Sequence, residues 1–594
     1  MNSAALPADT TVLRGAGPAT LGGAPRKPRT SAAPVTLAGR RQTAFARARH
    51  RLVIGGMVFA AGIAGLALRL GDLALLHDRP TTTASTLAML APKRGDILDR
   101  NGNELARSFE AFAISVAPRK LVGDPKLLAR RLAAIIPEKS EAQIYAELVH
   151  PGVFRYISRR VLPSQAKAIN DLGEPAITLE REPERLYPNL SLGAHALGYT
   201  DIDDGGMYGM EKALDRRLAD VATRGTPVQL AMDMRVQQAV ESELGAAMTE
   251  FRAIGAAGIV MDVHTGEVVA LASLPNFNPN AAGHSDDNSR FNRTTMGVYE
   301  LGSTFKALTI AMSLDSGFIH SMGQKYDATA PIHIGRFTIH DDRGHELRKW
   351  ATIPEIFIHS SNIGTAHMAA ELGAVKQRAY LDQLGFLNPV QVELPERGRT
   401  LYPASNNWGE IATMTVGFGH GVAVSPLHLA TAYTALVNGG ILHPATMLKI
   451  QPGAPVPGKR VFTEATSDKM RALLRLVVTS GTGRKANTPG YRVGGKTGTA
   501  EKAQGGRYAK HALVSTFASA FPMDAPRYVV IAMLDEPHGN AKTGGFATAG
   551  MVSAPIVEKI VARIGPILGV RPDMSRDIDI TGLLGLIDNK KVEE

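Results

Sequence analysis

The stretch Tyr299-Glu300-Leu301-Gly302-Ser303-Thr304-Phe305-Lys306, followed by an apolar run to Ser316 and then Gly317, decides how this chain folds. Gly302 allows the backbone to turn into a helix. The residues after it are apolar on nearly every side, which is typical of a helix buried inside a large domain. Gly317 has the position of a residue just past a helix end. We therefore predict a buried helix that begins near Ser303.

Ser303 and Lys306 are three residues apart, so their side chains lie on one face of this helix. A hydroxyl is a weak nucleophile until a base takes its proton, and a buried, neutral lysine can be that base. Backbone N–H groups at a helix start also point to where an oxyanion would form. A single Ser-x-x-Lys more often means a helix-start serine and a solvated lysine, and Ser164-Gln165-Ala166-Lys167 is a second copy.

Two motifs later in the chain distinguish the Ser-x-x-Lys sequence at Ser303 from the one at Ser164. Ser360-Ser361-Asn362 joins two helical stretches, and Lys496-Thr497-Gly498-Thr499 lies in an apolar strand that begins at Val493. Each has a rival elsewhere, because Ser405-Asn406-Asn407 lies in a Pro/Asn-rich loop and Lys542-Thr543-Gly544 follows a Gly/Asn turn. The ordered set Ser-x-x-Lys, Ser-x-Asn and Lys-Thr-Gly favours the catalytic interpretation of Ser303.

The composition sets limits on the function. A chain of 594 residues is too long for one ordinary core, so we expect at least two domains. The absence of cysteine excludes disulfides, thiolate catalysis and cysteine metal sites. We find no phosphate-binding loop and no convincing histidine pair at helical spacing, so we predict neither a metal nor a cofactor.

The net charge of +11 belongs mainly to the N-terminal tail. Residues 1–51 hold nine of the 66 basic residues and one of the 55 acidic residues, so this tail contributes +8. Its Ala/Pro/Gly/Arg-rich composition predicts disorder. Leu52 to Leu68 carries no charge, and apolar residues continue to Leu76, which predicts an uncleaved membrane anchor. The basic tail then stays in the cytoplasm and the rest of the chain lies outside it.

The body of the chain changes character near Thr226. Before it, short strands and turns suggest a non-catalytic pedestal. After it, we predict a helix over 235–251, a strand–turn–strand hairpin over 258–272, and late strands that complete an antiparallel sheet. The predicted fold is multidomain α+β, with an N-terminal transmembrane helix, an elongated pedestal and a catalytic domain whose antiparallel sheet is flanked by helices. The predicted parts are a disordered tail (1–51), an anchor (52–76), a pedestal (77–225), a catalytic domain (226–565) and a C-terminal tail (566–594).

The three motifs resemble those of penicillin-binding proteins and serine β-lactamases. The wider chain resembles the class B penicillin-binding proteins, specifically the cell-division transpeptidases of the FtsI type. Asn362 ends the second motif as in the division enzymes, whereas elongation relatives more often have Asp there. The other shared stretches are Arg94–Gly102, Arg185–Pro188, Gly209–Glu211, Phe277–Asn280, Gly417–Gly421 and Ser425–Leu427.

The resemblance implies a substrate and roles for the motif residues. The substrate would be a peptidoglycan stem peptide ending in D-Ala-D-Ala, and β-lactams would acylate the same serine. Ser303 would be the nucleophile and Lys306 its base. Ser360 would relay the proton toward the leaving amine, and Lys496 would help to hold the charge of this network. The implied substrate-binding residues are Asn362, Thr497, Gly498 and Thr499.

The resemblance also implies a place and partners. The protein would be a single-pass protein of the inner membrane with a cytoplasmic N-terminus and a periplasmic body. It would work with an FtsW-type glycan polymerase and other division proteins, and it would bind no nucleic acid. The acceptor amine and the role of residues 566–594 stay open at this point.

Four other functions share some of these sequence features. A β-lactamase of class A needs a glutamate that activates water, and Glu393-Leu394-Pro395-Glu396 lacks the pattern that those enzymes carry. A D,D-carboxypeptidase would use water as acceptor. Asn362 and the shared pedestal stretches argue against an elongation-type transpeptidase. A non-catalytic scaffold or β-lactam sensor should show a broken motif or extra apolar spans, and this chain shows neither.

Overall fold

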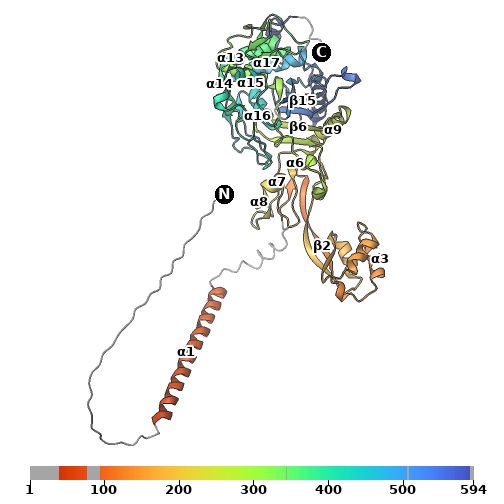
Figure 1. Ribbon diagram of the computed structural model, residues 1–594, viewed down its shortest axis with the longest axis vertical. Helices are drawn as coiled ribbons and strands as arrows, with labels where there is room; N and C mark the ends of the chain where they lie inside the picture. Colours follow the sequence, from red (N-terminus) through yellow and green to blue (C-terminus); the bar gives the residue numbers. More distant parts are fainter. Residues whose placement is uncertain (1–38, 76–93, 343, 505–506, 589–594) are drawn as a thin grey trace, which may run out of the picture. The chain divides into compact units, whose positions relative to one another are not determined.

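The structure is a computed structural model, and it describes residues 39–75, 94–342, 344–504 and 507–588 (Figure 1). The chain divides into two compact units, residues 1–86 and 87–594. The first unit contains the membrane-spanning candidate. The second contains the segments predicted as a pedestal and a catalytic domain, and we keep these two names for them.

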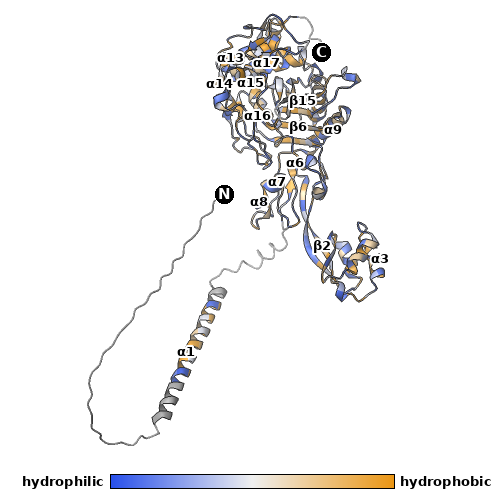
Figure 2. Cartoon of the chain, in the orientation of Figure 1, coloured by the Kyte–Doolittle hydropathy of each residue, from blue (hydrophilic) through white to orange (hydrophobic). Residues whose placement is uncertain are grey.

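In the first unit, helix α1 (Gly39–Leu75) carries the apolar anchor sequence (Figure 2). Among the described residues, α1 is the one helix that is long and apolar enough to cross a membrane, over Arg49–Leu70, and none of that window is buried. At 1.5 Å per residue, 22 residues span about 33 Å, enough for a bilayer core. The prediction of disorder is wrong for residues 39–51, which continue the helix. Residues 1–38 and 76 lie outside the described residues.

The pedestal is built on a five-stranded sheet. Strands β3 (Arg155–Val161), β2 (Glu104–Val116), β1 (Ile97–Leu98) and β5 (Val228–Gln229) are neighbours in that order, and β4 (Ile177–Leu186) also pairs with β2. Helices α3 (Pro125–Ile135), α4 (Glu141–Leu148) and α5 (Pro163–Asn170) cover its outer part with one apolar cluster. Val228 lies after the boundary predicted near Thr226, yet it pairs in parallel with Ile97 of the pedestal.

A buried ion cluster holds the base of the pedestal. The Arg94 and Arg185 guanidiniums donate to opposite oxygens of the Glu211 carboxylate, each at 2.7 Å. All three side chains are buried, and Arg94 also pairs with Asp215 at 2.8 Å. Glu211 lies in α7 (Gly209–Ala213), which is followed by α8 (Asp215–Ala219). Because buried charges need compensation, the cluster fixes this helix against the strand that follows Arg94.

The catalytic domain has a five-stranded antiparallel sheet. Its order is β14 (Gly494–Gln504), β15 (Arg507–Phe521), β16 (Tyr528–Asp535), β6 (Gly255–Asp262) and β7 (Val268–Leu274). The predicted hairpin is confirmed, since β6 pairs antiparallel with β7. β14 lies at the edge of the sheet, so it pairs with a strand on one side.

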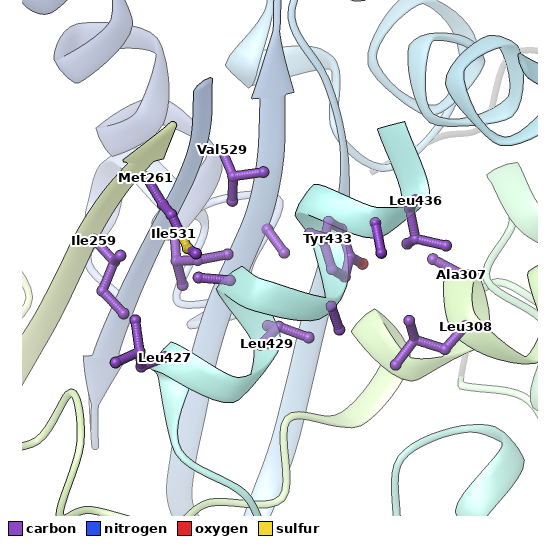
Figure 3. Packing of buried hydrophobic residues seen from close by; sticks show 14 of the residues in the cluster. Ile259, Met261, Ala307, Leu308, Leu427, Leu429, Tyr433, Leu436, Val529 and Ile531 are labelled. Atoms are coloured by element: carbon purple, nitrogen blue, oxygen red, sulfur yellow. The ribbon is translucent and has the colours of Figure 1, made fainter. Parts of the chain in front are cut away.

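Helices cover both faces of this sheet. Val260 packs in the cluster formed with α9 (Met234–Glu250) and α18 (Ser553–Ile567). Its neighbours Ile259 and Met261 point to the other face, where α16 (Pro426–Val437) supplies Leu427, Leu429 and Tyr433 (Figure 3). This alternation is the period of two that a strand requires. The α9 helix agrees with the helix predicted for 235–251.

The predicted helix after Ser303 is confirmed as α11 (Phe305–Asp315), whose residues from Phe305 to Leu314 are all buried. It packs among helices on the far side of α16, against α13, α15 and α17. The helices of this region are α12 (Ile353–Ile358), α13 (Asn362–Leu372), α14 (Ala374–Gln383), α15 (Glu410–Gly417) and α17 (Glu464–Ser480). Three two-stranded sheets join them: β8 (Lys325–Asp327) with β11 (Trp350–Thr352), β9 (Ile332–Ile334) with β10 (Phe337–Ile339), and β12 (Ile441–Leu442) with β13 (Lys459–Arg460). The remaining short helices are α6 (Ala194–Leu197), α10 (Asp287–Arg290) and α19 (Thr581–Leu584).

Replacing Glu211 by Ala should destabilise the pedestal strongly. Two buried guanidiniums would lose their shared carboxylate, a change that costs about 3–5 kcal/mol in comparable buried pairs. Thermal unfolding of the full chain in detergent, followed by circular dichroism, measures the effect.

The matched control is Glu104→Ala, because Glu104 pairs with Arg107 at 3.0 Å on the exposed face of the same sheet. Exposed pairs contribute little to stability, so this variant should unfold like the wild type. Equal unfolding temperatures for the two variants would contradict the role assigned to the cluster.

Candidate active site

Ser303 lies in a short 3-10 turn, η3 (Gly302–Thr304), that leads directly into α11. Gly302 has φ +53°, and a Cβ atom there would lie 2.8 Å from the carbonyl oxygen of Thr499. Glycine therefore permits the close approach of β14 to the nucleophile turn. Ser303 is half-buried. Part of the residue therefore stays accessible to a substrate.

Lys306 is directed to the second motif. Its side chain is 1% exposed, and Nζ donates to Ser360 Oγ at 3.2 Å and, at short range, to the Ser360 carbonyl oxygen. No direct hydrogen bond joins Lys306 to Ser303 in the part of the chain that the structure describes. The lysine instead connects the nucleophile's helix to Ser360.

Lys496 reaches the same hydroxyl from the opposite side. Its Nζ donates to Ser360 Oγ at 2.9 Å, and to the carbonyl oxygen and Oγ1 of Thr497, each at 3.1 Å. The side chain is completely buried. One hydroxyl therefore receives N–H groups from two lysines, one on the first turn of α11 and one on the edge strand β14.

Burial favours the uncharged form of both amines. It lowers the pKa of Lys306 to about 8, although the carboxylates of Asp342 and Asp341 oppose the shift. Burial, and then the charge of Lys306, lower the pKa of Lys496 well below its ordinary value. Two ammonium groups on one buried hydroxyl would repel each other. A neutral lysine that can accept a proton is therefore accessible near physiological pH.

Ser360 itself has an unusual backbone conformation. Its φ is +60°, in the left-handed region that residues other than glycine seldom adopt. The buried Asp341 holds the adjoining segment, because its carboxylate accepts from Ser361 Oγ at 2.9 and 3.0 Å and from the Ile363 N–H at 3.0 Å. No local sequence pattern predicts this contact, because Asp341 lies in a polar loop 20 residues before Ser361.

The structure brings the expected substrate-binding residues to the same place. Asn362 Nδ2 donates to the His340 carbonyl oxygen at 3.0 Å, and Thr497 Oγ1 lies 2.8 Å from Thr482 Oγ1. Thr499 Oγ1 accepts from the Ala549 N–H at 3.0 Å. At Gly498, a Cβ atom would lie 2.4 Å from the Leu301 carbonyl oxygen. Their side chains or backbone thus lie beside the Ser303 turn and the lysine pair.

Gly419 was recognised only as part of a shared stretch, and the structure shows why glycine is needed there. It has φ +85°, and a Cβ atom would lie 2.0 Å from the Gly302 carbonyl oxygen. The next glycine, Gly421, donates its N–H to Glu300 at 3.0 Å. This loop therefore packs directly against the residues that precede Ser303.

The rival motifs lie elsewhere. Ser164 is exposed on α5 of the pedestal, where Lys167 pairs with Asp171 at 3.0 Å. Ser405–Asn407 is an exposed 3-10 turn, and Lys542 is an exposed lysine that pairs with Glu250 at 3.0 Å. None of the three has the buried partners that Ser360 and Lys496 have.

Glu396, considered for water activation, points away from this cluster. Its carboxylate accepts from the N–H of Gly209, in the pedestal, at 3.2 Å. His195 is buried, and its Nε2 lies 2.8 Å from the Ser289 carbonyl oxygen. Across the described ranges, no three His, Asp or Glu side chains gather as a metal site would require.

Comparison with protein families gives two matches. Residues 256–562 match the penicillin-binding protein transpeptidase domain, and residues 89–225 match the penicillin-binding protein dimerisation domain. The first match contains all three motifs of the site. The second covers most of the segment that we interpreted as a pedestal.

Individual proteins are similar over most of the chain. A probable peptidoglycan D,D-transpeptidase FtsI of Caulobacter vibrioides is 41% identical over 492 residues, which are 80% of this chain and 82% of that protein. The peptidoglycan D,D-transpeptidase FtsI of Escherichia coli K12 is 30% identical over 540 residues, 85% of this chain and 87% of that protein. The crystal structure of penicillin-binding protein 3 from Mycobacterium tuberculosis, complexed with aztreonam, superposes with a TM-score of 0.64 at 26% identity, covering 81% of this chain and 98% of that one.

The site should react faster as the pH rises through about 8. Below that pH Lys306 is protonated and cannot accept a proton from Ser303, so the rate of labelling by a fluorescent penicillin should fall about tenfold for each pH unit. Above it, the neutral amine predominates and the rate should level off. Labelling rates measured across this range test the expectation.

Lys167→Ala should leave this pH profile unchanged, because Lys167 is exposed in the pedestal. Lys306→Met should remove the rise together with most of the labelling. A wild-type rate that stays constant between about pH 6 and pH 9 would contradict a neutral lysine as the base.

Proposed function

The chain belongs to the class B penicillin-binding proteins of the FtsI type, and on that premise we propose that it cross-links peptidoglycan stem peptides at the division septum through an acyl-serine intermediate. The observation that carries the proposal is the convergence of Lys306 and Lys496 on the Ser360 hydroxyl beside Ser303. This arrangement supplies a nucleophile, a neutral base and a route for a proton. Those are the requirements of acyl transfer to and from a serine.

In the first step, Ser303 Oγ attacks the carbonyl of the penultimate D-Ala. Lys306 takes the hydroxyl proton as the O–C bond forms. The Ser360 hydroxyl, bonded to both lysines, passes a proton to the leaving nitrogen, and the terminal D-Ala departs as the C–N bond breaks. Lys496 compensates changes of charge around Ser360. The donor stem is left as an ester on Ser303.

The remaining motif residues bind the donor stem. We assign the amide of the donor peptide to Asn362 and its terminal carboxylate to Thr497 and Thr499, with Gly498 allowing the strand to lie close to Ser303. The backbone N–H groups of Ser303 and Thr499 form the oxyanion hole. Such a donor contributes about 2.7–4 kcal/mol to transition-state stabilisation in comparable enzymes.

In the second step, an amine of a neighbouring stem attacks the ester. The new C–N bond forms the cross-link as the ester C–O bond to Ser303 breaks. The lysine and Ser360 network takes a proton from the attacking amine and returns one to the Ser303 oxygen. A β-lactam enters by the first route and leaves a stable acyl group, because its ring-opened product stays attached. Inhibition by β-lactams therefore follows from the same chemistry.

The protein is membrane-anchored through α1, and we propose a finer topology. The basic residues on the N-terminal side of the span favour a cytoplasmic N-terminus, a single pass through the inner membrane and a periplasmic body. We further propose the division into a pedestal over 77–225 and a transpeptidase domain over 226–565. An FtsW-type glycan polymerase and other division proteins are its proposed partners.

Replacing Ser303 by Ala should abolish covalent labelling by penicillin while the protein stays folded, since one oxygen atom is removed. Mass spectrometry of the wild-type protein after incubation should place the acyl group on Ser303. Its slow release would distinguish a transpeptidase from a β-lactamase.

Ser164→Ala is the matched control and should label like the wild type. Labelling that persists in the Ser303 variant, or that disappears in a folded Ser164 variant, would show that the nucleophile was assigned to the wrong motif. A folded wild-type protein that forms no adduct would refute the proposed function.

A further inference from the structure

The segment that follows α18 folds back onto the catalytic domain. Residues 571–588 lie beyond the residues that match the transpeptidase domain, yet they pack against the domain's main apolar cluster. Leu583 of α19 is buried, and Ile578, Ile580 and Ile587 are half-buried in the same cluster. We call residues 571–588 the strap.

The strap's first attachment is an ion pair with α17. The Asp577 carboxylate receives Arg475 Nε at 2.9 and 3.0 Å and Arg475 Nη2 at 2.6 Å. Such a bidentate pair fixes the orientation of the guanidinium as well as its distance from the carboxylate. The Arg475 guanidinium is 9% exposed, whereas Asp577 is 40% exposed. A nearly buried cation on the domain thus obtains its counter-charge from the strap.

Arg475 connects this pair to the third motif. Its Nη1 donates at 2.9 Å to the Val493 carbonyl oxygen and at 2.9 Å to Asn487 Oδ1. Val493 directly precedes β14, and Lys496 follows three residues later. Without Asp577, the buried guanidinium would lack a carboxylate and would have to move toward water. Its hydrogen bond to Val493 would move with it.

The strap's second attachment is at the start of α12. Thr352 Oγ1 donates to the Leu586 carbonyl oxygen at 2.8 Å, and the Asp588 N–H donates to Glu355 Oε1 at 3.2 Å. Thr352 and Glu355 form the capping box of α12. This short helix ends at Ile358, two residues before Ser360. The strap therefore contacts Arg475, which is bonded to the residue before the strand of Lys496, and α12, which leads to Ser360.

We propose that the strap positions Lys496 and Ser360 relative to each other, with Asp577 as the positioning residue on the Lys496 side. The inference rests on the proposed function, because positioning is defined by the acylation of Ser303. α17 packs against both α12 and β14, so one strap anchored on α17 and α12 can hold the two motifs at a fixed separation. Among the described residues, the strap makes no hydrogen bond or ion pair with Ser303, Lys306, Ser360 or Lys496, so its effect on them is indirect.

Single-turnover acylation by a fluorescent penicillin separates this role from a merely stabilising one. A segment that only stabilised the fold would change the fraction of protein that reacts, which is the amplitude. A positioning segment changes the rate constant of the chemical step at full amplitude. Both quantities come from the same time course, measured on the full chain in detergent.

The variants are Asp577→Asn, Asp577→Glu and a matched control, Asp579→Asn. Asp579 lies on the same segment, but its carboxylate accepts from its near neighbour Thr581, through the backbone N–H at 2.9 Å and through the side chain. We expect Asp577→Asn to lower the rate constant about tenfold, equivalent to one broken charged contact, at full amplitude. Asp577→Glu should restore most of the rate, and Asp579→Asn should match the wild type.

Equal rate constants for Asp577→Asn and Asp579→Asn, or a loss of amplitude alone, would overturn the proposal. If the wild type forms no adduct on Ser303, the proposed function fails instead. Hydrogen exchange then tests separately whether the strap holds residues 490–499. Faster exchange of residues 490–499 in Asp577→Asn than in Asp579→Asn supports the attachment, and equal exchange refutes it.

Discussion

The structure depends on one hydroxyl that binds two buried lysines. Ser360 Oγ receives N–H groups from Lys306 and Lys496, and neither amine is exposed to water. An exposed lysine would stay protonated and could not accept a proton at neutral pH. The lysine pair can therefore work only inside a domain large enough to bury it, which gives a physical reason for the extensive helical layer around α11.

The three groups come from separate elements, and close backbone contacts bring them together. Lys306 stands on the first turn of α11, Lys496 on the edge strand β14, and Ser360 after α12. Gly302, Gly419 and Gly498 each lie where a Cβ atom would collide with a neighbouring carbonyl oxygen. The site is thus assembled by backbone packing as much as by its side chains. Ser360 adds a strained φ that the Asp341 contacts help to hold.

The parts that the sequence predicted are those encoded locally. The helix after Ser303, the hairpin of β6 and β7 and the three motifs each follow from the spacing of a few neighbouring residues. Burial then separates the motifs from their rivals, and burial is a property of the folded chain. Asp341 and Asp577 could not be found in this way, because their partners lie far away in the sequence and single acidic residues have no distinctive pattern. The pairing of β5 with the pedestal was also missed, because a strand of two residues is too short to indicate its partner.

The order of strands in the catalytic sheet has a consequence for biosynthesis. β6 and β16 are central neighbours, with Asp262 opposite Tyr528, although the whole helical layer is encoded between them. Closing so long a loop costs chain entropy, and this cost comes before the strand pairing contributes any favourable free energy. A nascent chain that has emerged only as far as α17 exposes the apolar faces of β6 and β7 with no sheet to join. The domain therefore completes its core late, after nearly all of it has been synthesised, and during that interval it depends on whatever shields apolar strands from aggregation.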